Sequence, residues 1–570
     1  MISKRKHKYI FVIGGVMSGV GKGIATSSIG TLLQAKGFSV NLMKVDPYLN
    51  VDAGTMNPTE HGEVFVLNSG LETDQDMGNY ERFLNRDLSP ADYMTSGMVY
   101  QAVIERERSL GYKGKFVEAI PHVTDEIRER FARAAEVSGS DISVVEIGGT
   151  VGDYQNFLFI EAARVLHLRH PGDVAFVLVS YLPVPGTIGE MKTKPTQAAV
   201  RELNSYGVQP DFIIARGPVP LDEKRKEKLA IWCNVKAEHV ISAPDIASIY
   251  DVPVNFDRED FGTNILKTLS LKSRVRKDGL EKWKKFANRV MTGTEEVRIG
   301  IVGKYFDTGD FILLDAYLSV IEALKISAYH LGKKPVLSWI NSKGFDPKSG
   351  DGSGKEKTDV STLKDYDGII VPGGFGESGI EGKIKAIQYV RENKIPYFGL
   401  CYGMQLATIE YSRNVAGLEG ANTTEINPKT THPVIDIMPE QKKHMAEGKY
   451  GATMRLGAYP CALKEGTVAY AAYVKGKQSR VNGRASVSER HRHRYEVNPE
   501  YIAQLEKAGL VFSGTSPDGV LMEIAELPRK VHPFFLGTQF HPELQARPLA
   551  PHELFTAFIK AAIERNKDKK

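Results

Sequence analysis

The sequence reads Gly399-Leu400-Cys401-Tyr402-Gly403-Met404-Gln405 in its second half, and the interpretation of the chain starts from these residues. The residues before them, 395–398, have the pattern of a short buried strand, and the apolar spacing after them predicts a helix. A cysteine on such a turn between glycines is expected to be exposed, with the helix N-terminus favouring its thiolate. A lone free cysteine is, however, more often a buried core residue. The turn predicts an activated nucleophile only if other parts of the chain support it.

Two distant motifs give that support. The predicted strand 368–371 is followed by Pro372-Gly373-Gly374, where consecutive glycines can turn backbone N–H groups toward an oxyanion. The predicted strand 535–540 presents His541-Pro542-Glu543, in which the carboxylate can orient the imidazole. The chain order Gly-Gly, Cys, His-x-Glu therefore predicts Cys401, His541 and Glu543 as catalytic residues.

The composition sets limits on the class of protein. At 570 residues the chain exceeds one hydrophobic core and predicts at least two domains. Its net charge of only +5 gives no global field for nucleic acid or an anionic membrane. Three distant cysteines exclude a disulfide framework or a zinc site, and we find neither a signal peptide nor a membrane span. These features predict a cytoplasmic protein.

The N-terminal half begins with a phosphate-binding pattern. A predicted strand, 9–13, leads into the glycine loop 14–23 and a helix over 24–36. This layout aims backbone N–H groups and a helix N-terminus at a polyphosphate, with Lys22 at the helix start. Gly23 stands where a P-loop has the Ser or Thr that holds Mg²⁺, so a metal requires carboxylates from elsewhere. The alternative is a plain strand-to-helix turn.

Acidic residues supply candidates for that metal. A second strand, 38–43, delivers Lys44 to the same sheet edge if the sheet is parallel, and the strand 142–145 ends at Glu146. Asp76 lies in a polar segment, 72–76, which we expect to be a loop. Each carboxylate alone is more often a cap or turn residue, but together Asp76 and Glu146 are predicted to hold Mg²⁺.

A second basic motif is Lys192-Thr193-Lys194-Pro195-Thr196-Gln197. Its lysines, hydroxyls and amide can bind a triphosphate and a base, and its proline stiffens the turn. The alternative is a solvated cationic loop. Spacing alone does not decide whether Lys228, in a predicted helix over 224–232, joins this cluster.

The motifs of the first half resemble the synthetase domain of the CTP synthase family. The resemblance is carried by 14–23, 44–48, 57–66, 145–153 and 192–197, and the second half resembles a class I glutamine amidotransferase. It implies an α/β fold with two doubly wound domains, one a P-loop-like parallel-sheet synthetase. The implied boundaries are a synthetase over 1–272, a linker helix over 273–296 and an amidotransferase over 297–570.

The resemblance also implies an activity and partners. ATP phosphorylates the uracil 4-oxygen of UTP, and ammonia from glutamine hydrolysis displaces the phosphate to give CTP, with Lys22, Lys44 and Mg²⁺ neutralising charge. CTP is implied as feedback inhibitor and GTP as allosteric activator. The implied assembly is a homotetramer, with filament formation left open, and His61 is implied as a gate for ammonia.

The site residues that the resemblance implies fall into four groups. ATP is assigned to Gly19, Val20, Gly21, Lys22, Gly23, Ile24, Asp76, Pro244, Asp245 and Ile246. UTP and CTP are assigned to Ser18, Asp153, Tyr154, Gln155, Lys192, Thr193, Lys194, Pro195, Thr196, Gln197 and Lys228. Glutamine is assigned to Gly374, Tyr402, Gly403, Met404, Gln405, Glu425 and Arg494. The metal is assigned to Asp76 and Glu146.

The sequence departs from the family pattern at two positions. Gln155 replaces the usual Glu in the CTP-binding tripeptide, which puts the strength of CTP inhibition in question. Ser378 replaces an Arg in a loop linked to GTP activation, which puts that activation in question.

Several alternatives stay open. The basic segment 270–296 is read as an amphipathic connector helix, with a nucleic-acid arm as the alternative. The run 489–495 resembles an RNA-binding patch by charge, although Arg494 fits the glutamine carboxylate, and no metal is assigned to its histidines. Rival functions are a different glutamine-dependent ATP ligase that amidates a carboxylate, and a non-catalytic filament or regulatory protein.

Overall fold

The computed structural model describes residues 7–57, 61–186, 189–275, 279–303, 307–308, 311–312, 314–346, 359–374, 376, 379–438, 441, 454–474, 479–481 and 483–569. The chain forms two compact units, each considered by itself. The first unit contains Met1–Ala53 and Asp76–Asn288, and the second contains Gly54–Gln75 and Arg289–Lys570. The segment Gly54–Gln75, predicted to belong to the synthetase domain, therefore lies in the second unit, and the predicted linker over 273–296 is divided between the two units after Asn288.

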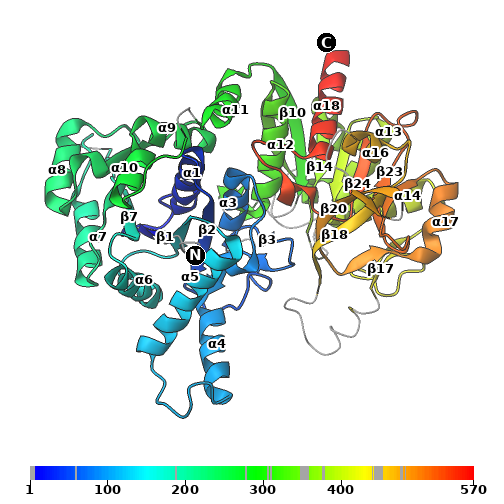
Figure 1. Cartoon of the computed structure of the whole chain (residues 1–570). Coiled ribbons are helices and arrows are strands. Elements are labelled where there is room, and N and C mark those ends of the chain that lie inside the picture. The colour runs from blue at the N-terminus through cyan, green and yellow to red at the C-terminus, as the bar shows by residue number, and fades with distance from the viewer. Residues whose placement is uncertain are drawn as a thin grey trace. The chain divides into compact units, whose positions relative to one another are not determined.

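The first unit is built on a seven-stranded sheet in the described residues, with the order β5-β2-β6-β1-β7-β8-β9. Figure 1 labels three of these strands, β1, β2 and β7. Every neighbouring pair is parallel. The strands are continuous apolar runs because both faces are covered by helices. Their bounds are β1 (Lys8–Gly14), β2 (Val40–Asp46), β5 (Tyr93–Thr95), β6 (Ile142–Ile147), β7 (Val174–Tyr181), β8 (Phe212–Gly217) and β9 (Val240–Pro244). The predicted parallel sheet is confirmed.

Helices cover both faces of this sheet. The helices α5 (Thr124–Ser138), α6 (Phe157–Arg169) and α7 (Lys194–Ser205) share one core with Phe11 and Phe176. On the other face, α1 (Lys22–Ala35) packs with α3 (Asp76–Leu84) and α9 (Val252–Arg258). The remaining helices are α4 (Ser96–Arg108), which packs on α5, and α8 (Glu223–Cys233) and α10 (Phe261–Thr268).

The parallel register brings the predicted phosphate and metal residues to one edge. Lys44 on β2 pairs with Glu146 on β6, and Glu146 pairs with Val12 on β1, just before the glycine loop. Two local predictions were wrong. Asp76 is the first residue of helix α3, not a loop residue, and the segment 192–197 is only partly a loop because α7 begins at Lys194.

The second unit contains a ten-stranded sheet in the described residues, with the order β13-β10-β14-β15-β24-β23-β22-β18-β20-β19. The first five of these strands are parallel, and the others are antiparallel. The parallel part contains β10 (Glu296–Gly303), β13 (Lys334–Asn341), β14 (Gly368–Val371), β15 (Tyr397–Leu400) and β24 (Phe535–Thr538). The antiparallel part contains β18 (Arg455–Leu463), β19 (Ser479–Val481), β20 (Arg484–His493), β22 (Val511–Thr515) and β23 (Met522–Glu526).

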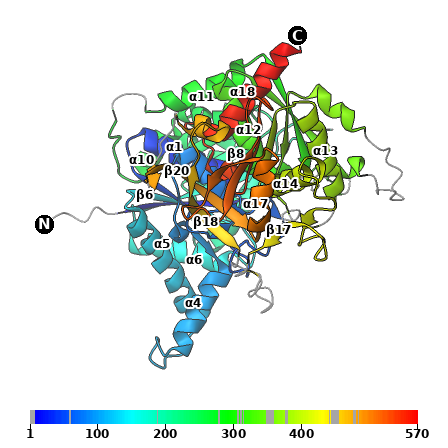
Figure 2. The same ribbon diagram turned by 90° about the vertical axis from the view of Figure 1, so that its right-hand side faces the viewer.

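Helices again form two layers on this sheet. The helices α12 (Leu318–His330) and α18 (Glu553–Asp568) pack together on one face, where Figure 2 shows them side by side. The helices α13 (Ile380–Glu392) and α14 (Tyr402–Asn414) pack on the opposite face. Further elements are α16 (Val468–Tyr473), α17 (Pro499–Lys507), the pair β11 (Asp307–Thr308) and β12 (Phe311–Ile312), and a small sheet of β16 (Asn422–Thr423), β17 (Pro433–Ile437) and β21 (Tyr495–Val497).

The segment Gly54–Gln75 belongs to the second unit although it comes from the first half of the sequence. It contains the short antiparallel pair β3 (Phe65–Val66) and β4 (Glu72–Thr73). Its backbone approaches β18 closely, since the N–H of Ala458 donates to the carbonyl of Asn68 at 2.9 Å.

The predicted connector helix is α11 (Glu281–Thr292). Its apolar residues Trp283, Phe286 and Ala287 are buried, and the indole N–H of Trp283 donates to the carbonyl of Tyr250 at 2.7 Å. Lys282 and Lys285 are exposed. The predicted amphipathic helix is thus confirmed.

Candidate functional site

Cys401 occupies a strained turn between β15 and α14. Its φ of 48° and ψ of −97° are unusual for a residue with a side chain, and such strain is often found at functional sites. The flanking glycines allow the chain to turn this tightly. A Cβ on Gly399 would lie 2.7 Å from the backbone carbon of Gly403, and a Cβ on Gly403 would overlap the carbonyl oxygen of Val371.

The thiol is less accessible than the sequence predicts. Only 4% of Cys401 is exposed, so the expectation of an exposed cysteine was wrong. The residue instead opens into a cavity of about 410 Å³, within the range of small-molecule sites. The lining is Gly54, Thr55, Met56, Glu63, Val64, Ala316, Tyr317, Val320, Pro372, Gly373, Gly374, Cys401, Met454, Arg492, Arg494, His541, Glu543 and Leu544.

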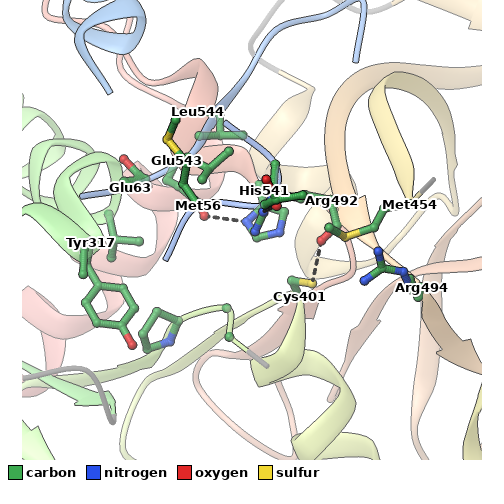
Figure 3. Close-up of a pocket in the computed structure, with 18 residues that line it drawn as sticks. Met56, Glu63, Tyr317, Cys401, Met454, Arg492, Arg494, His541, Glu543 and Leu544 are labelled. Atoms are coloured by element: carbon green, nitrogen blue, oxygen red, sulfur yellow. Dashed lines mark hydrogen bonds and ion pairs between the residues drawn. The ribbon is translucent and has the colours of Figure 1, made fainter. Parts of the chain in front are cut away.

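His541 faces Cys401 in this cavity (Figure 3). Its Nδ1–H donates to Oε1 of Glu543 at 2.7 Å, because a carboxylate can only accept. The other ring nitrogen, Nε2, is buried without a hydrogen-bond partner among the described residues. Burial lowers the pKa of His541, but Glu543 and Cys401 outweigh burial and raise it well above its ordinary value. The three predicted catalytic residues therefore meet, with the imidazole held in the tautomer that leaves Nε2 for the thiol.

The backbone of Gly373 lies beside both Cys401 and His541. A Cβ on Gly373 would be 3.0 Å from Cε1 of His541 and 3.8 Å from Cβ of Cys401. A side chain at position 373 would thus enter the space between the two catalytic residues. The glycine keeps that space open beside the predicted oxyanion-binding backbone.

The residues predicted to bind the substrate glutamine divide into those that line the cavity and those that do not. Gly374 and Arg494 line the cavity with Cys401. Tyr402, Gly403, Met404 and Gln405 form the buried first turn of α14 and are not among the cavity's described lining residues. Glu425 is likewise outside the lining, and its Oε1 accepts the backbone N–H of Gly376 at 2.9 Å.

One side of the Cys401 cavity is formed by the segment 54–75, which was not predicted from the sequence. Met56, Glu63 and Val64 line the cavity, whereas His61 is exposed and does not. Arginines on β20 hold this segment. Arg490 is fully buried and donates to Oδ1 of Asn68 at 2.6 Å and to the carbonyl of Val66 at 3.1 Å. Arg492 pairs with Glu72, at 2.8 Å between Nε and Oε1.

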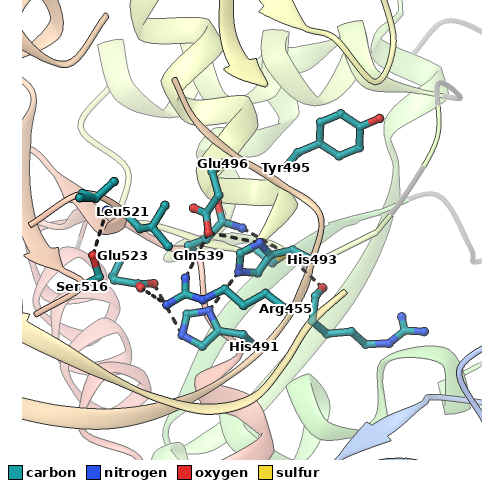
Figure 4. A network of polar contacts seen from close by, with 12 residues as sticks. Arg455, His491, His493, Tyr495, Glu496, Ser516, Leu521, Glu523 and Gln539 are labelled. Atoms are coloured by element: carbon teal, nitrogen blue, oxygen red, sulfur yellow. Dashed lines mark hydrogen bonds and ion pairs between the residues drawn. The ribbon is translucent and has the colours of Figure 1, made fainter. Parts of the chain in front are cut away.

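His491 and His493, which alternate with these arginines in the sequence, point to the opposite face of β20. Side chains alternate along a strand, so the sequence Arg-His-Arg-His separates into two functions. In Figure 4, His491 and His493 lie together beside Arg455, with 3.0 Å between Nδ1 of His491 and Nε2 of His493. The alternation of arginine and histidine in the sequence indicates that β20 has two different faces. It does not indicate which residues each face contacts.

The histidine cluster is buried and contains acidic groups. Arg455 pairs with Glu496 at 3.1 Å and with Glu523 at 2.7 Å. Burial lowers the pKa of both histidines well below the ordinary value, with Arg455 and His541 adding to the effect. Both histidines are therefore neutral at pH 7 and serve a structural role near His541.

In the first unit, the ammonium of Lys44 lies among three carboxylates. Its Nζ is 2.9 Å from Oε1 of Glu146 and 3.7 Å from Oδ1 of Asp46, and it also bonds to Asp76. Burial alone would raise the pKa of Asp76, but Lys44 holds it below its ordinary value. The hydroxyl of Tyr80 donates to Oε2 of Glu146 at 2.5 Å. The predicted ligands Asp76 and Glu146 therefore meet around one cation.

This acidic group fits the chemistry of Mg²⁺. Oxygen ligands from one or two carboxylates, completed by phosphates and water, are its usual protein arrangement. The described residues contain no set of three or more His, Cys, Asp or Glu side chains that could hold a metal by itself. Asp76 also lies against Gly23, where the usual metal-binding hydroxyl is missing.

A separate cavity of about 230 Å³ is lined by several of the residues predicted to bind ATP. Gly21 and Ile24 line it with Pro244, Asp245 and Ile246. Gly21 adopts a φ of 80° at the start of α1, and Lys22 donates to the carbonyl of Gly149 at 2.8 Å. Arg216 also lines this cavity and pairs with Asp245 at 2.7 Å, and the sequence analysis missed it. Gly19, Val20 and Gly23 belong to the adjoining loop and helix start.

The predicted UTP residues are spread along the same unit. Lys192 forms an ion pair with Glu190 at 2.6 Å, and both side chains are exposed to solvent. Lys192 is the main cause of the lowered pKa of Glu190, and Arg225 and Lys228 contribute less. Whether Lys228 joins the predicted UTP site stays a prediction. By contrast, Thr196 and Gln197 are buried in the first turns of α7.

The remaining predicted UTP and CTP residues lie in or near turns. Asp153 accepts the backbone N–H of Thr150 at 2.6 Å, and the next two residues, Tyr154 and Gln155, are exposed. Ser18 is exposed on the glycine loop. Thr193 is the N-cap residue of α7, followed by Lys194 and Pro195. Ser378 lies outside the described residues.

Sequence comparisons agree with the two halves. Residues 8–271 match the family model described as the CTP synthase N-terminus, and residues 312–561 match the class I glutamine amidotransferase model. A CTP synthase from Caldanaerobacter subterraneus subsp. tengcongensis is 48% identical, covering 98% of this chain and 98% of that protein. A CTP synthase from Pyrococcus furiosus is also 48% identical, covering 99% of each chain.

A solved structure is similar over the second half. It is the glutaminase domain of Trypanosoma brucei CTPS with bound acivicin, at 36% identity and a TM-score of 0.40. The similarity covers 47% of this chain and 94% of that one. Separately, none of the helices in the described residues is both long and apolar enough to cross a membrane.

Proposed function

Because this chain belongs to the CTP synthase family, we propose that its two sites divide the reaction between Cys401, which releases ammonia, and the Lys44 region, where UTP is activated. The chain is a glutamine-dependent ligase that converts UTP to CTP with ATP in pyrimidine biosynthesis. The observation that carries the assignment of the first site is the strained Cys401 turn facing His541, whose Nδ1–H is held by Glu543.

At the first site, His541 takes the thiol proton of Cys401 and the sulfur attacks the amide carbon of glutamine. The electron pair of the carbonyl moves to oxygen near the Gly373-Gly374 backbone. His541 then gives its proton to the departing ammonia, and water hydrolyses the thioester to glutamate. Arg494 is the cavity-lining cation for the substrate carboxylate, since guanidinium and carboxylate pair well.

At the second site, we assign ATP to the loop from Gly19 to Ile24 with Pro244, Asp245 and Ile246. The cavity formed by Gly21, Ile24 and the 244–246 segment supports this assignment. Lys22 and Lys44 would neutralise charge on phosphates, and Asp76 and Glu146 would hold Mg²⁺. The contact of Lys44 with both carboxylates supports this assignment. When bound, Mg²⁺ supplies charge neutralisation and orientation for the transferring phosphoryl group.

UTP is assigned to the basic group around Lys192 and Lys228 with the loop 153–155. This assignment rests on the family relationship, since the described contacts are those of Lys192 with Glu190 and of Asp153 with the backbone of Thr150. We further propose CTP as inhibitor at this site, GTP as activator, a homotetrameric assembly and a cytoplasmic location. These four proposals rest on the family relationship, and the loop containing Ser378 contributes no structural argument to them.

The direct test uses two nitrogen donors. Purified protein is mixed with UTP, ATP and Mg²⁺ and either glutamine or ammonium chloride, and CTP is followed by chromatography. Cys401→Ala should abolish the glutamine reaction and keep the ammonia reaction, whereas Cys233→Ala, at a buried cysteine of the other unit, should keep both. Equal loss of both reactions in Cys401→Ala would contradict the proposed division.

A further inference from the structure

Gln539 lies beside the sulfur of Cys401 and has no role in the assignments above. It follows β24 and precedes His541 by two residues. Its side chain is fully buried, and its backbone N–H donates to the carbonyl of Glu523 at 2.8 Å, which fixes the residue in place. The side-chain Nε2 donates to Sγ of Cys401 at 3.6 Å. A buried amide is thus directed at the proposed nucleophile.

The neighbouring Gln405 determines which end of this amide faces the sulfur. Nε2 of Gln405 donates to the carbonyl of Tyr495 at 2.9 Å and to Oε1 of Gln539 at 3.3 Å. Reversal of the Gln539 amide would place two NH₂ groups against each other and an oxygen against the sulfur. The hydrogen-bond network therefore directs an N–H group, not an oxygen, at Cys401.

The sulfur has a second polar neighbour of the opposite kind. The carbonyl oxygen of Arg492 lies 3.9 Å from Sγ and can accept a hydrogen bond only from the protonated thiol. The Gln539 N–H, in contrast, is best matched to the thiolate, because charge-assisted hydrogen bonds are stronger than neutral ones. The two neighbours of Sγ therefore suit its two protonation states.

From this geometry we propose that Gln539 is a further catalytic residue of the glutaminase site, whose N–H stabilises the Cys401 thiolate and holds the sulfur for attack. The proposal rests on the proposed role of Cys401 as the nucleophile. It adds a donor from the segment between β24 and His541 to the three residues predicted from the sequence.

The effect of Gln539 comes before the new bond forms. The thiol proton moves to Nε2 of His541, and the sulfur lone pair then forms the C–S bond while the carbonyl electron pair moves to oxygen. Because the sulfur loses its charge in this step, the N–H···S interaction weakens as the bond forms. Gln539 therefore lowers the barrier through the part of this interaction that remains in an early transition state, where the sulfur still carries much of its charge, and not by stabilising the tetrahedral intermediate.

Two substitutions isolate the donor. Gln539→Met keeps a side chain of similar length but removes the N–H group. Gln539→Glu keeps the shape and places a carboxylate oxygen near the sulfur. Alkylation by iodoacetamide, followed as a function of pH, reports the thiolate population of Cys401. The other cysteines react slowly because burial raises the pKa of Cys233 to about 11 and that of Cys461 well above its ordinary value.

The expected result is an ordered shift of the alkylation profile. Its midpoint should move up by about one pH unit in Gln539→Met, a tenfold loss of thiolate, and further in Gln539→Glu. The glutamine-dependent kcat should fall about tenfold or more, with a smaller change in KM for glutamine. CTP formation from ammonium chloride should be unchanged in both variants.

The matched control is Gln545→Met. Gln545 lies four residues after His541, and its Nε2 donates to the carbonyl of Ser488 at 3.1 Å. This variant should retain the wild-type alkylation profile and both CTP-forming reactions. A shift equal to that of Gln539→Met would show that the effect is not specific to the donor facing Cys401, and would overturn the proposal.

The outcomes separate this proposal from the assignment of Cys401. Identical alkylation profiles in wild type and both Gln539 variants would overturn the role of Gln539 alone. Loss of the ammonia-dependent reaction in both variants would give Gln539 a structural role and also overturn it. If alkylation of the wild-type protein left the glutamine reaction intact, the nucleophile assignment itself would fail.

Discussion

The carboxylate of Asp76 occupies the space that a side chain on residue 23 would need, since a Cβ on Gly23 would overlap its Oδ1 atom. A P-loop usually has Ser or Thr at this position, and its hydroxyl binds Mg²⁺. Here an acidic residue from α3 reaches the same place. The absence of a side chain at Gly23 therefore makes room for the carboxylate that we propose as a metal ligand.

Gly23→Ser should accordingly impair the synthetase site. The new side chain displaces Asp76 from Lys44 and from the proposed metal position, so we expect CTP formation to fall about a hundredfold with either nitrogen donor. Glutamine hydrolysis measured as glutamate release should persist. In the control Gly262→Ala, the new Cβ meets its nearest neighbour at 3.4 Å, an ordinary contact, and CTP formation with both donors should be kept.

Glu543→Gln should weaken the glutaminase reaction. Because Glu543 raises the pKa of His541, its neutralisation lowers that pKa and narrows the pH range in which the imidazolium is present. We expect the glutamine-dependent kcat to fall about a hundredfold, within the range for a positioned proton-transfer group. A pH profile of glutamate release measures the shift of its alkaline limit to lower pH.

The control for that substitution is Glu564→Gln on the exposed side of α18. It removes one carboxylate from the same unit without touching the cavity. An unchanged pH profile in Glu543→Gln would show that the carboxylate does not tune His541.

His532→Asn should reduce the sensitivity of the protein to acid. Burial lowers the pKa of His532 to about 4, and its ring accepts the N–H of Phe534 at Nδ1 and donates to the carbonyl of Val390 from Nε2. In the unfolded chain His532 therefore binds a proton as the pH falls below about 6.5, whereas in the folded protein it stays neutral until about pH 4. Stability is lost as the pH falls from about 6.5 toward 4, by roughly 2 kcal/mol between pH 7 and pH 5.

Urea unfolding at pH 7 and pH 5 measures this difference. In His532→Asn the loss between the two pH values should be smaller by about that amount, although the variant is less stable at pH 7. His432→Asn serves as the control at a partly buried histidine of the same unit. Equal acid sensitivity of wild type and His532→Asn would contradict the linkage.

Arg490→Met should loosen the segment 54–75. The substitution leaves the carbonyl of Val66 and the side chain of Asn68 without their buried donor, and such losses typically cost about 3 kcal/mol. Because Met56, Glu63 and Val64 line the glutaminase cavity, KM for glutamine should also rise several-fold. Denaturant unfolding and limited proteolysis within 54–75 measure the two effects.

Arg484→Met is the comparison for that experiment, since Arg484 is exposed at the start of the same strand. It should change neither proteolysis nor KM. Protection of the segment in Arg490→Met equal to that in the wild type would show that Arg490 is not needed to hold it.

The three residues predicted to be catalytic lie together in the structure because each stands near a strand end marked by a local motif. Cys401 lies between Gly399 and Gly403, where the tight turn leaves no room for a Cβ, and His541 lies three residues after the end of β24, the strand that pairs with β15. In the first unit, a parallel sheet is enough to predict that Lys44 and Glu146 lie close together, because both stand at the carboxyl ends of neighbouring strands. Local pattern and sheet direction are sufficient for such sites.

The sequence did not predict contacts that depend on packing between distant segments. The alternation of arginine and histidine along β20 indicates two faces, but not that one holds Asn68 and Glu72 while the other adjoins Arg455. The expected exposure of Cys401 was wrong for the same reason, since its accessibility depends on what covers the turn. The direction of the Gln539 amide likewise depends on Gln405, 134 residues away.

The place of residues 54–75 in the second unit has a consequence for modular engineering. A glutaminase cut from the chain at residue 297 would leave behind the strand pair that Arg490 and Arg492 hold, together with one side of its own reaction chamber. A transplant of this amidotransferase to another ammonia-using enzyme must therefore carry a piece of the synthetase sequence with it. The segment 54–75 thus connects the two halves of the sequence in addition to the linker, so a cut at residue 297 does not yield a complete second unit.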